Sequence, residues 1–266
     1  MMWAIIKVTF WEGLRNKAVF GIALLAGLMM MFTVVLSGMI MRDVGKVAAD
    51  LTLSTATFAS LLVVLFVGIN ILARDFERKT IYLALARAVP RSRYLVARFL
   101  GLGVLQAFIV LLLLFVSLST LLLVKNIYSG YFGLVSLKVV ALAHLFVLVQ
   151  MLLISSMSMF FSMVASSSFV TFMLTTISWI IGSSTQEVML LVESDTTLHL
   201  SPVTKMIVTL AYYLFPNLSL FDFKAIAAHG LAVDVQRISI SLGYGLAYMV
   251  AVLALTIILF KRKELT

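Results

Sequence analysis

The sequence predicts an all-α polytopic membrane protein with six transmembrane helices, an N-terminal interfacial helix and a short helix in a cytoplasmic loop. Of its 266 residues, 63% are hydrophobic and 12% are charged, whereas about a quarter of the residues in soluble domains are charged. Six apolar stretches reach the length of about 20 residues that a transmembrane helix needs. The segments between them are too short for a domain with its own core, so residues 1–266 are expected to form one transmembrane domain.

The six expected spans contain almost no charge. Their ionisable side chains are His144 and Glu187. The fifth span is the least regular, because polar residues 182–186 interrupt its second half. The expected spans cover residues 19–40, 53–73, 99–124, 139–165, 169–192 and 239–260.

Lys and Arg lie unevenly along the chain, and this predicts its orientation. With both termini in the cytoplasm, thirteen of the twenty Lys and Arg residues lie on the inner side, and that side carries the whole formal charge of +9. The basic composition is therefore a topology signal, not a sign of nucleic-acid binding. We expect a multi-pass protein of the cell (inner) membrane.

Several chemistries are disfavoured by composition. The absence of Cys excludes disulfides, thiolate metal sites and a Cys nucleophile, and three His residues are few for a metal or haem site. Some of the fifteen Met residues are consecutive, and consecutive side chains on a helix point in different directions. Such residues do not form one metal-binding face, so we interpret the Met residues as side chains that fill packing gaps in the core. The spans contain no Lys or Asp that could activate a Ser nucleophile. We expect no metal site, no cofactor and no catalytic residues on this chain.

Two segments outside the spans have amphipathic patterns. Trp3 to Leu14 predicts a helix lying in the membrane interface; the alternative is a basic anchor that only fixes topology. The one sizeable cytoplasmic loop, Arg74 to Arg98, begins with acidic residues suited to a helix N-terminus and has Pro90 as a helix stop. Its helix could bind lipid headgroups or dock on a soluble partner. Apolar residues recur every four positions in both segments: Ile6, Phe10, Leu14; Ile81, Leu85, Val89.

Three pieces of the sequence resemble ABC-2 type transporter permeases, most closely the six-span group that includes the copper-processing NosY permeases. In the loop they are Glu77, Thr80, the apolar run 81–85, Pro90, Arg93 and the re-entry Arg98, Phe99, Leu100, Gly101. Lys79 stands where the family often has Gly. The other pieces are Glu12 with Arg15, Asn16 and Lys17, and then Leu214, Phe215, Pro216, Asn217 and Phe221.

The resemblance implies a non-catalytic permease subunit, working as an exporter. Its implied partners are a second permease, in a homodimer or heterodimer, two cytoplasmic ATP-binding-cassette ATPase subunits, and membrane lipid. ATP and Mg would be bound by the ATPase, and this chain has no G-x-x-x-x-G-K-[ST] phosphate loop. The loop helix from Asp75 to Val89 would be the coupling helix that seats in the ATPase. Its implied coupling residues are Asp75, Phe76, Glu77, Arg78, Lys79, Ile81, Tyr82 and Leu85.

Polar residues form one stripe on each of the fourth and fifth spans. Small polar faces allow close helix packing; alternatively, they line a pathway that is wetted during transport. The intramembrane His144 is either a functional group or a local hydrogen-bonding residue. The candidate residues are His144, Ser155, Ser158 and Ser162 on one span and Thr171, Thr175 and Ser178 on the next.

The longest outer segment, residues 193–238, is rich in aromatic side chains around Pro216. This composition is typical of an interfacial or re-entrant element, and in similar permeases such a region caps the translocation path as short broken helices. The alternative is a surface loop that anchors the sixth span. A rival function for the whole chain is a membrane scaffold or signalling subunit that binds a soluble partner without moving a substrate. The sequence does not identify a substrate.

Overall fold

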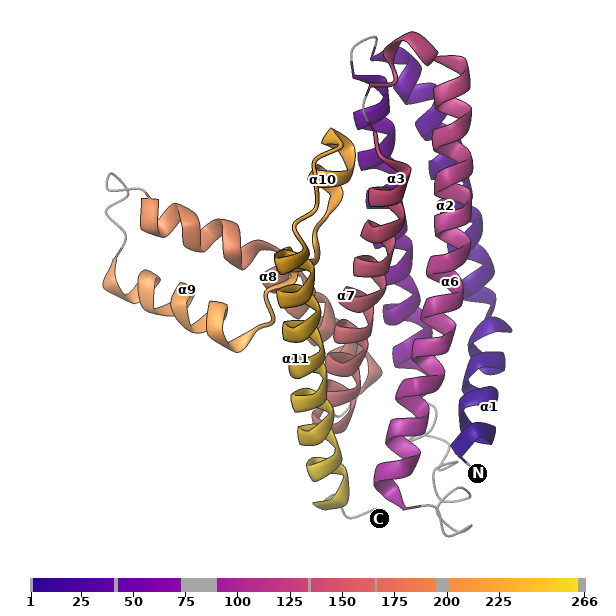
Figure 1. Cartoon of the computed structure of the whole chain (residues 1–266). Helices are drawn as coiled ribbons and strands as arrows, with labels where there is room; N and C mark the ends of the chain where they lie inside the picture. Colours follow the sequence, from indigo (N-terminus) through magenta and orange to yellow (C-terminus); the bar gives the residue numbers. More distant parts are fainter. Residues whose placement is uncertain are drawn as a thin grey trace.

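The computed structural model describes residues 2–40, 43–72, 90–133, 135–165, 167–194 and 201–262, and all regular secondary structure in these ranges is helical. The predicted all-α class is confirmed. The helices form an elongated bundle with both chain termini at one end (Figure 1). We call this the terminal end and the opposite one the distal end. The elements are α1 (Met2–Leu14), α2 (Lys17–Met39), α3 (Val44–Val63), the π-helical turn η1 (Val64–Gly68), α6 (Arg91–Ile127), η2 (Ser129–Tyr131), α7 (Leu137–Val164), α8 (Ser168–Ser194), α9 (Pro202–Leu214), η3 (Leu218–Phe221), α10 (Lys224–His229) and α11 (Val235–Arg262).

Six helices in the described ranges are long and apolar enough to cross a membrane, and they correspond to the six predicted spans. They are α2, α3 with its continuation to Leu72, α6, α7, α8 and α11. The pair Val203–Leu214 and Leu218–His229, bent by 50°, raises the number to seven if it counts as one broken span. The predicted multi-pass membrane protein is confirmed.

Two spanning helices begin earlier than expected. Helix α3 starts at Val44 instead of residue 53, and α6 starts at Arg91 instead of residue 99. The expected bounds stopped at charged residues, whereas the helices continue through them beyond the apolar section. Their charged first turns can lie in water or at the headgroups, where Lys46 forms a 3.2 Å ion pair with Asp43.

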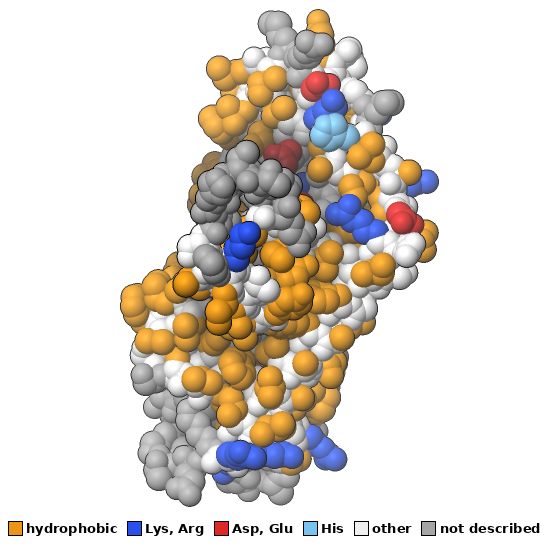
Figure 2. Space-filling model, turned by 90° about the vertical axis from the view of Figure 1, so that its left-hand side faces the viewer, with side chains coloured by type: hydrophobic (Ala, Val, Ile, Leu, Met, Phe, Trp, Pro, Cys, Tyr) orange, Lys and Arg blue, Asp and Glu red, His pale blue; other side chains and the backbone are white. Residues whose placement is uncertain are grey.

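The side chains at the surface follow the pattern of a protein in a bilayer. Figure 2 shows a broad apolar band on one face, with Lys and Arg at its lower edge and both acidic and basic side chains in the upper half. Helices α2 and α11 leave most of their apolar side chains at the surface, whereas α3 is the most buried span. Lipid tails would cover these exposed apolar surfaces.

Two clusters of buried side chains hold the bundle together. The distal cluster joins α3, α7, η3 and α11 around Phe146, Phe221 and Met249. The other cluster joins α2, α3 and α6 around Met30 and Leu105. Both include α3, which explains why this span is the most buried.

The predicted N-terminal helix is present as α1, and it packs along the first turns of α6 (Figure 1). Close approach needs glycine here, because a Cβ atom added at Gly101 would lie 2.5 Å from the Thr9 Cβ atom. Phe10 meets Phe108 edge to face, with ring centroids 5.8 Å apart. Trp3 is exposed. Protein contacts therefore set the position of α1 in addition to any contact with lipid.

The segment predicted to lie on the outer side, residues 193–238, contains short helices in its described part. The second half of α8 and α9 project sideways from the bundle, and the chain then returns through η3 and α10 towards α3 and α7 (Figure 1). Gly230, in the left-handed conformation with φ 61°, ends α10. The residues predicted to form the coupling helix, 75–89, lie outside the described residues.

Candidate functional site

The predicted polar stripes on α7 and α8 are packed surfaces in this structure. The side chains of Ser155, Ser158, Thr171, Thr175 and Ser178 are buried. Each hydroxyl, like that of Ser162, donates a hydrogen bond of 2.7 to 3.2 Å to a carbonyl oxygen three or four residues earlier in its own helix. Such hydroxyl groups are satisfied without water, so this arrangement favours the interpretation of close helix packing.

His144 also bonds within its own helix. Its Nδ1 atom lies 2.9 Å from the carbonyl oxygen of Val140. The ring is 1% exposed, and the Nε2 atom has no hydrogen-bond partner among the described residues. Neither His144 nor the stripe residues line the pocket described next.

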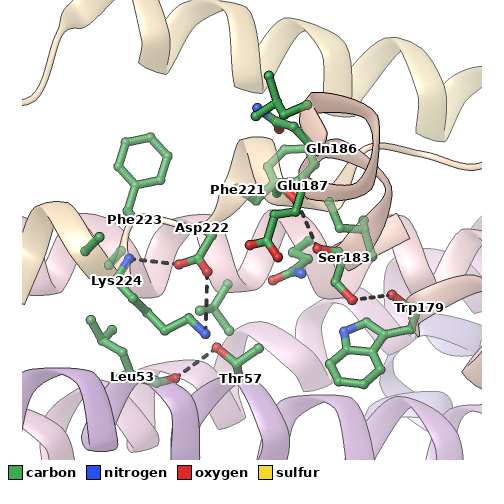
Figure 3. Close-up of a pocket in the computed structure, with 17 residues that line it drawn as sticks. Leu53, Thr57, Trp179, Ser183, Gln186, Glu187, Phe221, Asp222, Phe223 and Lys224 are labelled. Atoms are coloured by element: carbon green, nitrogen blue, oxygen red, sulfur yellow. Dashed lines mark hydrogen bonds and ion pairs between the residues drawn. The ribbon is translucent and has the colours of Figure 1, made fainter. Parts of the chain in front are cut away.

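A cavity of about 320 Å³ lies between α3, α7, α8 and the segment that joins α9 to α10 (Figure 3). We call it the central pocket. Thr57, Gln150 and Trp179 line it, and each lies near the midpoint of its spanning helix. Part of the pocket is thus enclosed by spanning helices. Asp222, which precedes α10, and Lys224, its first residue, line another part.

The wall contributed by η3 is attached to α8 by polar contacts. The Asn217 side chain accepts a 3.1 Å hydrogen bond from the Ser219 N–H at the start of η3 and donates another of 3.1 Å to Gln186. The Ser219 hydroxyl donates a 3.0 Å bond to the carbonyl oxygen of Ser183. Gly182 permits this close approach, because an added Cβ atom would lie 2.5 Å from the Pro216 carbonyl oxygen.

The same wall is also held by α11 and α7. The hydroxyl of Tyr244 accepts a 2.9 Å hydrogen bond from the Asn217 N–H. The Tyr248 hydroxyl donates a 2.9 Å bond to the carbonyl oxygen of Leu214. Phe223 stacks on Phe146 of α7, with ring centroids 4.0 Å apart. Contacts with α7, α8 and α11 therefore hold the bend after α9 in place.

Three polar groups of the central pocket lack partners among the described residues. Gln150 is 8% exposed and makes no hydrogen bond there. The Nε1 atom of Trp179 is buried without an acceptor. Glu187 is exposed, its carboxylate forms no ion pair or hydrogen bond with the described residues, and Figure 3 shows it directed into the same space as Asp222. Buried polar groups normally find partners, so Gln150 and the indole N–H of Trp179, unpartnered at one cavity, indicate space for a polar ligand or water.

Asp222 differs from Glu187 because its carboxylate is already engaged. One oxygen accepts a 2.9 Å hydrogen bond from the Lys224 N–H, and the other lies 3.5 Å from the Lys224 ammonium. The two charges offset each other. The structure contains no group of three or more His, Cys, Asp or Glu side chains suited to a metal ion within the described residues.

Sequence reasoning missed most of this pocket. It noted Glu187 as ionisable within a span and residues 182–186 as a polar interruption, but it assigned neither to a site. Gln150, Trp179, Asp222 and Lys224 were not singled out at all. The available signal was the polar interruption, because α8 continues through it as one helix and directs Ser183, Gln186 and Glu187 to the pocket.

A scan against models of known protein families returns no match, and neither does a search of the curated proteins.

Proposed function

We propose that this chain is the membrane-spanning permease subunit of an ATP-binding-cassette transporter of the ABC-2 type, an exporter whose ATP is hydrolysed on a separate subunit. The observation that carries the transport part is the central pocket. Polar groups buried among spanning helices, such as Gln150 and the Trp179 N–H, are costly when they lack partners. A bundle that served only as an anchor would have no use for them, whereas a permease needs a site within the membrane for its substrate.

The ATP-dependent part rests on the resemblance, and the geometry of the terminal end supports it. Two of the resembling pieces meet there, because Arg98 contacts Glu12. The chain leaves α3's continuation at Leu72 and re-enters α6 after Pro90, so residues 73–89 connect two spans of the bundle. An ATPase that moved this loop would act on α3, whose Leu53 and Thr57 line the central pocket.

The proposed partners fit the remaining exposed surfaces. The terminal end, with its Lys and Arg, would face the cytoplasm and the ATPase pair. A second permease, the same chain or a similar one, would pack on the spans, with lipid covering the rest. One apolar surface available to either is the outward face of α9, with Val203, Met206, Ile207 and Leu210 each more than 60% exposed.

Co-purification tests the proposal. The chain, expressed in its own cells and extracted in mild detergent, should bring with it an ATP-binding-cassette ATPase. Ile81→Asp should reduce this association by about thirtyfold or more, because an apolar anchor in such an interface contributes about 2 kcal/mol. Ser129→Asp, an exposed site in η2, is the matched control.

Two results would count against it. If the captured partner is a soluble protein without ATPase activity, the chain is a scaffold or signalling subunit. If the ATPase is captured equally by the wild type and by Ile81→Asp, residues 75–89 are not the coupling helix.

A further inference from the structure

We infer that the central pocket binds an organic cation: a compound with a positively charged amine, a hydrogen-bond acceptor and an apolar body. The inference rests on the proposed function only in calling this ligand the transported substrate. Its binding to the pocket stands on the geometry of the pocket itself.

The charge of the ligand follows from Glu187. The ionisable side chains that line the pocket are Glu187, Asp222 and Lys224. Since Lys224 is paired with Asp222, Glu187 leaves the lining with one negative charge that is not offset. The nearby Arg237 guanidinium lies over the Phe223 ring, 5.2 Å from its centroid, and does not line the pocket. Glu187 is exposed at the pocket, and its carboxylate attracts a cation and disfavours an anion.

The acceptor on the ligand follows from Trp179 and Gln150. The indole N–H is a donor only, and it is buried without an acceptor among the described residues. The Gln150 amide, more than nine-tenths buried, can donate and accept. A hydroxyl, ether or carbonyl oxygen on the ligand would satisfy both groups. A simple metal cation would leave the indole donor unpaired.

The apolar body follows from the size and walls of the pocket. Its volume of about 320 Å³ lies at the lower end of the range for sites that hold drug-sized ligands, about 300 to 1,000 Å³. Leu53, Val147 and Phe221 supply apolar wall. The pocket therefore suits a small amphipathic amine better than a large lipid or saccharide.

Trp179 offers a reporter inside the pocket. The chain has three Trp residues, and Trp3→Phe with Trp11→Phe leaves Trp179 as the single emitter. This variant, purified in lipid nanodiscs without ATP, is titrated with benzoylcholine. The probe carries a quaternary amine, an ester carbonyl and an aromatic body. Its uncharged analogue 3,3-dimethylbutyl benzoate has the same shape, with carbon in place of the charged nitrogen.

Benzoylcholine should change the Trp179 emission saturably, and the uncharged analogue should not. Glu187→Gln should weaken benzoylcholine binding by up to about fivefold, since an exposed ion pair contributes up to about 1 kcal/mol. Glu187→Asp should retain most of the affinity. Asp50→Asn removes an exposed carboxylate of α3 that does not line the pocket, and should leave binding unchanged.

Equal responses to the two probes, an unaffected Glu187→Gln variant, or no saturable response would each overturn the inference. This titration needs no ATPase, so its failure is distinct from that of the proposed function. A chain that binds benzoylcholine through Glu187 but captures no ATPase would retain the ligand class and lose the transporter assignment. A chain that captures the ATPase but does not bind benzoylcholine would retain the transporter assignment and lose the ligand class.

Discussion

The guanidinium of Arg98 lies 3.1 Å from a carboxylate oxygen of Glu12, and this ion pair joins the N-terminal helix α1 to the first turns of α6. The same nitrogen donates a 2.9 Å hydrogen bond to the Thr9 hydroxyl, and the Arg98 Nε atom donates one of 3.2 Å to Tyr94. Arg98 is 7% exposed. A buried guanidinium needs such partners, so α1 is part of the packed structure.

Glu12→Gln should therefore destabilise the protein by about 2 kcal/mol, because it removes the charge that compensates a buried cation. Lys7→Gln, an exposed change on the same helix, should have little effect and serves as the control. Thermal unfolding of both variants in the same detergent measures the difference. Equal unfolding temperatures would show that the pair does not stabilise the fold.

Two substitutions of Ser158 can distinguish a packing role from a polar role for the stripe on α7. Its side chain is fully buried, and its hydroxyl bonds to the Ser155 carbonyl of the same helix. Ser158→Ala should cost less than about 1 kcal/mol, because the bond it removes is local. Ser158→Leu should cost about 1 to 3 kcal/mol through overpacking. A wetted pathway predicts instead that Ser158→Ala, which removes only the hydroxyl, already abolishes transport.

The six spans could be predicted because the thickness of a bilayer fixes the length of an apolar helix. Their ends could not, since a helix continues through charged residues where it leaves the hydrocarbon. Val44 and Arg91 are examples. The central pocket was also hidden, because Gln150, Glu187 and Asp222 meet only when α7, α8 and the segment before α10 pack together. Periodicity identifies one face of one helix, and this pocket takes residues from several elements.

The orientation of the bundle can be tested on this Cys-free chain. Ser92 lies at the start of α6 near the terminal end, and Ser129 lies in η2 after the distal end of α6. With the terminal end in the cytoplasm, an impermeant maleimide should label Ser129→Cys in intact cells and Ser92→Cys only after permeabilisation. The reverse pattern would place both termini outside and would contradict the proposed site for the ATPase.

Gly182 is the position where a single methyl group should disturb the central pocket. An added Cβ atom would lie 2.5 Å from the Pro216 carbonyl oxygen and 2.9 Å from the Leu218 Cγ atom. A backbone carbonyl held by its neighbours cannot move without moving η3. Gly182→Ala should therefore cost about 1 to 3 kcal/mol and should also alter the emission of Trp179.

Gly243→Ala is the matched control, because nothing lies within 4 Å of a Cβ atom added in that part of α11. An exposed helical Gly is less stable than Ala by roughly 0.5 to 1 kcal/mol, so this change should leave the protein equally stable or slightly more stable. Unfolding of the two variants in the same nanodiscs gives the comparison. If Gly182→Ala behaves like Gly243→Ala, η3 does not pack against α8 as described, and the central pocket would have a different wall.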